Sequence, residues 1–201
     1  MRASSSLAGI AVFTALIVGS DFGLAPFADV KLLDTIVFVV AFVFGFRVGA
    51  TVAVLSETIW SVVSPWGIAG AITPFLVGGE LLFALAGFAA SKVWETPRNL
   101  SVFSARNAFF GATLAICAFI WDFETNIATG IIAGAQTFSG LLAYEVFGIP
   151  FMISHELSDF ALGSILAPIA IVYSSRVFGR RAAGITAQAP FQTAQTGSRV
   201  N

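Results

Sequence analysis

The sequence contains six long apolar segments, each close to the length that a helix needs to cross a lipid bilayer. A transmembrane helix takes roughly 20 apolar residues to span about 30 Å of hydrocarbon. The segments predict an all-α membrane protein built as a bundle of six transmembrane helices. We expect a single transmembrane domain over residues 1–179 and a polar, disordered tail over residues 180–201. The six segments cover residues 7–23, 32–46, 48–63, 69–93, 105–133 and 151–177.

The composition supports this class and excludes others. Hydrophobic residues make up 57% of the chain and charged residues 10%, with a mean hydropathy of +0.91. A soluble domain usually carries about a quarter charged residues, so this chain lacks the charge for a soluble surface. The net charge of -1 and the absence of a basic cluster away from the helix ends argue against a nucleic-acid partner. Cys117 is the single cysteine, which excludes a disulfide within the chain.

The first apolar segment has two interpretations. Arg2 and the apolar stretch 7–18 fit a cleaved signal peptide. We favour a retained helix, because Ala11, Ala15 and Gly19 recur at every fourth position and form a flat strip that another helix can approach closely. The strip either packs within this chain or docks another membrane subunit, and the spacing alone does not separate these alternatives.

The basic residues predict the orientation. With six spans, nine of the ten basic residues lie on the side that holds both termini, and only Lys31 lies on the other side. Basic residues concentrate in cytoplasmic connections, so we expect both termini in the cytoplasm and a multi-pass protein of the plasma membrane. Asp21, Asp29, Asp34 and Glu145 fall at or near the predicted outer ends. The nine are Arg2, Arg47, Lys92, Arg98, Arg106, Arg176, Arg180, Arg181 and Arg199.

Residues 136–150 are harder to assign. They are moderately apolar and include Tyr144 and Glu145. They fit either a surface loop or a partly re-entrant lid, and the sequence does not decide between the two.

Ionisable residues within the predicted spans are the first candidates for function, because each costs several kcal/mol in lipid unless it faces water or a partner. No Lys or Arg is expected at comparable depth. Some of the acids must therefore be protonated, hydrogen-bonded or in contact with water or ligand. A site without a deep basic residue favours a neutral or cationic heterocycle over a strongly anionic substrate. These residues are Glu57, Glu80, Asp122, Glu124, His155, Glu156 and Asp159.

The fifth segment carries a polar stripe. On a helix, Asp122, Thr125 and Asn126 stand at i, i+3 and i+4, next to Trp121. A carboxylate, a hydroxyl and an amide beside an indole suit a small polar aromatic ligand. Alternatively, these groups only form hydrogen bonds between neighbouring helices.

The sixth segment contains the single histidine. His155 and Asp159 share a helix face at i, i+4, and Glu156 follows the histidine. A histidine with two acids suggests a metal site or a proton relay. The spacing is not H-E-x-x-H and there is no second histidine, so we expect no metal site, no cofactor and no catalytic residue here. A hydrogen-bond network near the outer end is the alternative.

Two further segments carry candidates for ligand contact. Glu57 and Trp60 stand at i, i+3 in the third segment, and Trp66 lies in the turn that follows. Trp66 is either an anchor at the membrane interface or a ligand platform, whereas Trp60 is deeper and better placed to contact a bound ring. Glu80 lies in the middle of the fourth segment, and we expect it to face a cavity.

Four stretches of this sequence resemble motifs of one transporter family. They are the A-x-x-x-A pattern of residues 11–15, the stretch 29–50 with its Gly-rich turn, Trp121-Asp122 with Thr125-Asn126, and residues 148–158. In order and spacing, the chain resembles the substrate-binding S component of energy-coupling factor (ECF) transporters over residues 5–178.

This resemblance implies a function and partners. The alanine face would contact a transmembrane coupling subunit, and the outer part of the bundle would hold a small vitamin-like molecule. The chain has no G-x-x-x-x-G-K-[ST] phosphate loop, so paired ATPase subunits would have to drive uptake. We therefore predict a binding subunit rather than an enzyme. The expected substrate-binding residues are Trp60, Glu57, Glu80, Trp121, Asp122, Thr125, Asn126, His155 and Asp159.

Two other functions remain open on the sequence alone. The first is a membrane-embedded enzyme that uses His155, Glu156 and Asp159 as acid and base groups. The second is a structural subunit of a membrane complex, in which the polar residues serve only helix packing. A ligand-sized cavity favours the importer, whereas a solid bundle would refute it.

Overall fold

A computed structural model describes residues 3–27, 29–94 and 104–186 of the chain. In these ranges the fold is all-α, as predicted, and five of its helices are long and apolar enough to cross a membrane. The elements are α1 (Ala3–Leu24), α2 (Leu33–Phe44), α3 (Phe46–Val63), the short 3-10 turn η1 (Gly70–Ile72), α4 (Thr73–Val93), α5 (Ala105–Ile132) and α6 (Phe138–Thr186).

The described ranges contain six α-helices, which confirms the predicted number. The expectation that all six span the membrane is corrected for α2, which is too short. At 12 residues, α2 is about 18 Å long, which is too short for about 30 Å of hydrocarbon. Nine of its residues are buried. A helix that is apolar on all sides is stable when other elements surround it. α2 is therefore the central helix of the protein.

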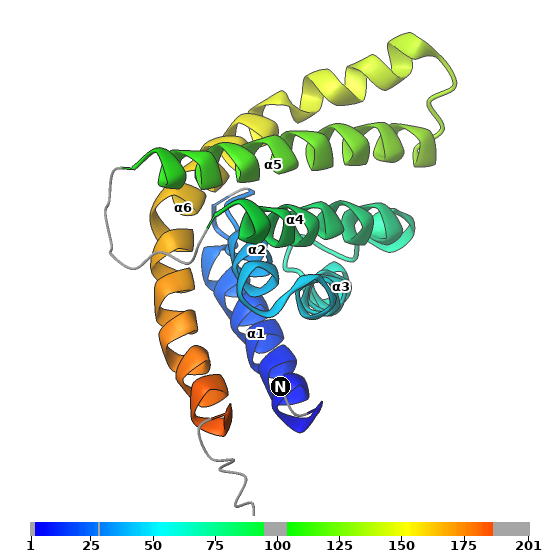
Figure 1. The fold of residues 1–201 in the computed structure, drawn as a ribbon. Coiled ribbons are helices and arrows are strands. Elements are labelled where there is room, and N and C mark those ends of the chain that lie inside the picture. The colour runs from blue at the N-terminus through cyan, green and yellow to red at the C-terminus, as the bar shows by residue number, and fades with distance from the viewer. Residues whose placement is uncertain (1–2, 28, 95–103, 187–201) are drawn as a thin grey trace, which may run out of the picture.

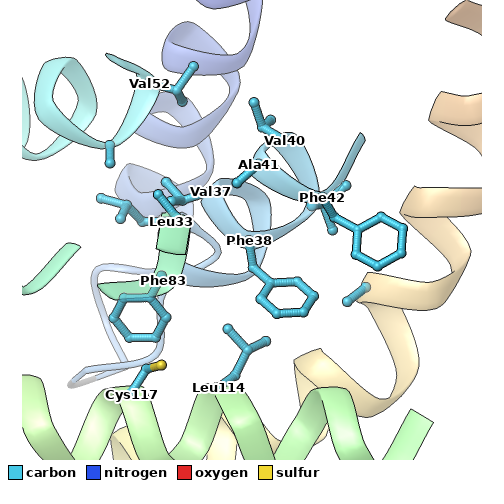
Figure 2. Close-up of a cluster of buried hydrophobic side chains, with 14 of the residues drawn as sticks. Leu33, Val37, Phe38, Val40, Ala41, Phe42, Val52, Phe83, Leu114 and Cys117 are labelled. Atoms are coloured by element: carbon cyan, nitrogen blue, oxygen red, sulfur yellow. The ribbon is translucent and has the colours of Figure 1, made fainter. Parts of the chain in front are cut away.

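The hydrophobic core is built around α2. Figure 2 shows Val37, Phe38 and Phe42 of α2 among side chains from neighbouring helices, with Leu114 and Cys117 of α5 nearby. The rings of Phe38 and Phe110 meet edge to face at 5.4 Å. Burying such rings contributes on the order of 2 kcal/mol each and holds the Phe38 face of α2 against α5.

A glycine makes the tight turn between α2 and α3. Gly45 has a φ of 91°, which is unfavourable for other residues, and its N–H donates to the carbonyl of Ala41 at 2.9 Å. A Cβ on Gly49 would collide with Ala41, so α3 can lie directly against α2. The break between the second and third segments therefore falls two residues before the predicted position at residue 47.

Helix α6 has 49 residues and resolves the assignment of residues 136–150. From Phe138 onward this stretch is helical and continuous with the rest of α6, so it is not a surface loop. It packs against the end of α5, where a Cβ on Gly148 would collide with Asn126. At its other end α6 continues to Thr186, so the predicted tail begins as helix; residues 187–201 lie outside the described ranges.

The helices do not form a simple parallel bundle. At about 74 Å, α6 is far longer than one crossing, and it bends along its length, with Pro150 and Pro168 inside it. Figure 1 shows α4, α5 and the first part of α6 running alongside one another, with α1 and the last part of α6 at a steep angle to them. The N-terminal end of α1 and the C-terminal end of α6 lie at the same end of the molecule. Their location in the cytoplasm stays a prediction.

Candidate functional site

Each of the six α-helices contributes an ionisable side chain to the interior of the protein. All of these residues are at most 5% exposed. Ionisable groups at this depth are costly, and they are retained where they pair with one another or bind something. They are Asp21 of α1, Asp34 of α2, Glu57 of α3, Glu80 of α4, Asp122 of α5, and His155 and Asp159 of α6.

Four of these residues form one cluster centred on His155. Its Nδ1 lies 3.1 Å from Oδ2 of Asp122, and its Nε2 lies 3.2 Å from Oδ2 of Asp34. Asp159, one helical turn further along α6, places its Oδ2 3.9 Å from the same Nε2. We call Asp34, Asp122, His155 and Asp159 the histidine–aspartate cluster. A neutral imidazole donates only one hydrogen bond, so the cluster requires an extra proton or another cation to satisfy both contacts.

Trp121 and Lys31 cover one side of this cluster. The indole of Trp121 meets the imidazole of His155 edge to face at 5.4 Å, and its Nε1 donates to the carbonyl of Leu76 at 3.1 Å. Lys31 holds its Nζ 4.5 Å from the centre of the Trp121 ring. A Cβ on Gly79 would collide with the indole, so this glycine in α4 leaves the space that Trp121 fills.

Lys31 corrects the expectation that no basic residue reaches the buried acids. Burial lowers the pKa of its ammonium, but the carboxylates of Glu57, Asp34 and Asp29 raise it more, so the pKa lies above the usual range for lysine. The ammonium therefore stays charged at neutral pH. A charged ammonium beside the cavity can pair with an anionic substrate, so the structure corrects the expectation that such a substrate is disfavoured.

A cavity of about 220 Å³ opens beside Lys31, between the α1–α2 connection and the turn after α3. It brings two indoles, three acids and the ammonium together. The connection above it is held in place by Asp21, whose Oδ1 accepts the N–H of Leu32 at 3.1 Å. The lining residues are Asp21, Ala25, Phe27, Asp29, Val30, Lys31, Glu57, Trp60, Ser61, Ser64, Trp66, Gly67, Ala69 and Leu76.

The predicted substrate-binding residues fall into three groups. Glu57 and Trp60 line the cavity. Asp122, His155 and Asp159 belong to the histidine–aspartate cluster, with Trp121 against it and Glu80 fully buried in α4. The third group is Thr125 and Asn126 on α5.

Thr125 and Asn126 direct their polar groups to protein atoms. The Thr125 hydroxyl donates to the carbonyl of Trp121 at 2.9 Å, within α5. The Asn126 amide donates to the carboxylate of Glu145 on α6 at 3.5 Å. The Asn126 contact joins α5 to α6, as the helix-packing alternative expects, whereas the Thr125 hydrogen bond stays within α5; neither residue lines the cavity.

The sequence reasoning missed three residues of this region. Asp34, Lys31 and Asp21 were assigned to the outer ends of helices, whereas the structure brings them to the cluster and the cavity. A signal was present for Asp34, because it interrupts an otherwise apolar stretch. Its partner His155 is 121 residues away, and no local pattern could pair them.

The strip of small residues on α1 is not packed within the described part of the chain. Ala11, Ala15 and Gly19 are exposed, and a Cβ on Gly19 would meet no neighbouring atom within 4 Å. Lipid or another protein can therefore cover this face.

The fold and the composition define the class of this protein: it is an all-α, multi-pass membrane protein. Comparison with models of known families, with curated protein sequences and with solved structures finds no match.

Proposed function

We propose that this chain is the substrate-binding subunit of an ECF-type importer, which captures a small vitamin-like molecule for uptake driven by partner ATPases. The observation that carries the proposal is the cavity beside Lys31. Pockets for drug-sized ligands measure about 300–1,000 Å³, so about 220 Å³ suits a compact ligand.

The lining of the cavity favours a flat ring with polar substituents. Trp60 is 8% exposed, so its indole forms an inner wall of the cavity. Trp66 is 70% exposed, so its indole lies at the solvent-facing edge of the cavity. Phe22 of α1 stacks edge to face on Trp60 at 5.3 Å and fixes the orientation of its ring. Glu57 can accept hydrogen bonds from a ligand, and Lys31 can donate them.

The exposed strip on α1 supports the partner in this proposal. Small side chains let two helix backbones approach closely within lipid, where tight packing drives association. Ala11, Ala15 and Gly19 present such a surface outward. A coupling subunit that docks here would leave the cavity at the other end of α1 free for ligand.

Binding is favoured over catalysis by the surroundings of His155. Both of its ring nitrogens face buried carboxylates, so neither is directed at the cavity. Glu156, the other proposed acid, is half-buried and does not line the cavity.

The test is a thermal-shift screen of the purified chain in detergent with water-soluble vitamins and their precursors. We expect one compound class to raise Tm. Trp66→Ala should weaken binding about tenfold without lowering the Tm of the ligand-free protein, because Trp66 is exposed. Phe138→Ala is the matched control, since Phe138 is 81% exposed and lies outside the cavity. A response that Trp66→Ala leaves unchanged would place the ligand elsewhere, and no response to any compound would contradict the proposal.

A further inference from the structure

The histidine–aspartate cluster gathers the donor atoms of a metal site from two helices. Nε2 of His155, a carboxylate oxygen of Asp34 and a carboxylate oxygen of Asp159 all lie within 4.8 Å of one another. All three residues are 0% exposed. Asp34 is 121 residues from His155 in the chain, so only the packing of α2 against α6 creates this arrangement.

Several of the buried oxygens here lack hydrogen bonds. Among the described residues, both carboxylate oxygens of Asp159 and Oδ1 of Asp34 have no hydrogen-bond partner. Asp159 nevertheless directs Oδ2 toward the imidazole, at 3.9 Å from Nε2. Glu80 of α4 is fully buried and lies close to Asp34, with which it interacts through its side chain. A buried carboxylate without a partner costs several kcal/mol, so these oxygens are available as ligands for a metal ion.

We propose that the cluster binds a divalent first-row transition-metal ion through His155 Nε2, Asp34 and Asp159. In a tetrahedral site with bonds of about 2.0–2.1 Å, neighbouring ligand atoms lie about 3.3 Å apart. The observed separations from Nε2 are 3.2 Å to Asp34 and 3.9 Å to Asp159. A small rotation of Asp159 therefore completes the three-ligand set.

Asp122 supports this assignment from the other side of the ring. Its Oδ2 lies 3.1 Å from Nδ1 of His155, where it accepts a hydrogen bond when the ring carries its proton on Nδ1. That hydrogen bond leaves the Nε2 lone pair directed at Asp34 and Asp159. Metal-binding histidines almost always donate their other ring N–H to a carboxylate or carbonyl in this way. Without a metal ion or an extra proton, the same lone pair would face two carboxylates at close range, which is repulsive.

The donor set indicates the class of metal. One imidazole and two carboxylates suit Zn²⁺, Mn²⁺, Fe²⁺ or Co²⁺, and the set contains no thiolate that would favour Cu(I). The site lies behind Trp121 and Lys31, which separate it from the cavity. The proposal stands on these donors alone and does not depend on the proposed transport function.

The test uses the full chain purified in detergent through a tag that contains no histidine. After chelation, the protein is dialysed against Zn²⁺ or Mn²⁺, and bound metal and Tm are measured. We expect about one ion per chain and a rise in Tm. Asp159→Asn should weaken binding at least tenfold. Glu156→Gln is the matched control, because it removes the acid next to His155 that supplies no donor atom to the site; it should bind metal like the wild type.

If Asp159→Asn does not fold, nitrogen NMR of the wild-type protein tests the same site. His155 is the only histidine in the chain, so nitrogen NMR of histidine-labelled wild-type protein reports on this ring alone. Metal addition should shift Nε2 and leave Nδ1 protonated. Two protonated nitrogens that do not respond to either ion would overturn the proposal and identify the ring as an imidazolium paired with Asp34 and Asp122. Metal that binds equally well to Asp159→Asn would also overturn it.

Discussion

The ammonium group of Lys31 lies 4.5 Å from the centre of the Trp121 ring, and the same ring contacts His155 edge to face. Lys31 also lines the cavity. One lysine and one tryptophan therefore separate the cavity from the histidine–aspartate cluster. Any ligand that displaces Lys31 would alter the packing of Trp121 on His155, so the two regions are physically connected.

Replacing Lys31 tests this connection. Lys31→Gln removes a cation–π contact and the charge that faces Glu57 and Asp34, and we expect a loss on the order of 1 kcal/mol in the free energy of unfolding. Lys92→Gln is the matched control. Lys92 also lies over a ring, 4.7 Å from the centre of Phe88, but it is exposed, so its loss should matter little.

The effect of Lys31→Gln should depend on pH in a defined direction. The pKa of Lys31 is raised in the folded protein, so its contribution is complete below the unfolded pKa of about 10.4 and is lost as the pH rises through the folded value. The Tm difference between wild type and variant should therefore persist to about pH 9 and shrink above about pH 10.4. A difference that does not change at high pH would show that the charge of the ammonium does not contribute.

Gly79 should tolerate no side chain, because a Cβ at this position collides with the Trp121 indole. We expect Gly79→Ala to cost about 1–3 kcal/mol and to change the Trp fluorescence. The neighbouring Gly78 meets no atom within 4 Å, and Gly78→Ala should be neutral or stabilise α4 by up to about 1 kcal/mol. Thermal unfolding of both variants in detergent measures this contrast. Equal effects would contradict the packing of Trp121 against α4.

His155 should be coupled energetically to Asp34. His155→Gln removes the group that bridges Asp34 and Asp122 and should cost about 3–5 kcal/mol, because buried carboxylates lose their partner. Asp34→Asn removes one of these charges. The double variant should therefore be less destabilised than the sum of the two single variants, by about 0.5–3 kcal/mol. Additive effects would argue against a direct interaction between the two helices at this point.

The small residues of α1 should matter for association and not for folding. Ala15 is exposed, so Ala15→Trp should leave the Tm of the isolated chain unchanged. Within cells, the same variant should no longer co-purify with membrane partners, since the bulky ring prevents close helix contact. Ile116→Trp on α5 provides the control, because Ile116 is 60% exposed and lies outside this strip. Retained association of Ala15→Trp would contradict docking at this face.

The sequence by itself determined the class of fold. Segment length and apolar composition are local properties, and they predicted the all-α membrane fold, the boundaries of most helices within a few residues and a break close to Gly45. The cost of charge in lipid also marked His155 and Asp122 as unusual, because each interrupts an apolar segment.

Tertiary structure decided how these residues combine. Whether an acid such as Asp34 lies at an outer end or at the centre depends on which helix surrounds which, and α2 proved to be the central one. The contact between Asp34 and His155 joins positions 121 residues apart, and Lys31 reaches the acids only because its connection folds inward. Such pairings follow from the packing of whole helices, which hydropathy and residue spacing do not encode.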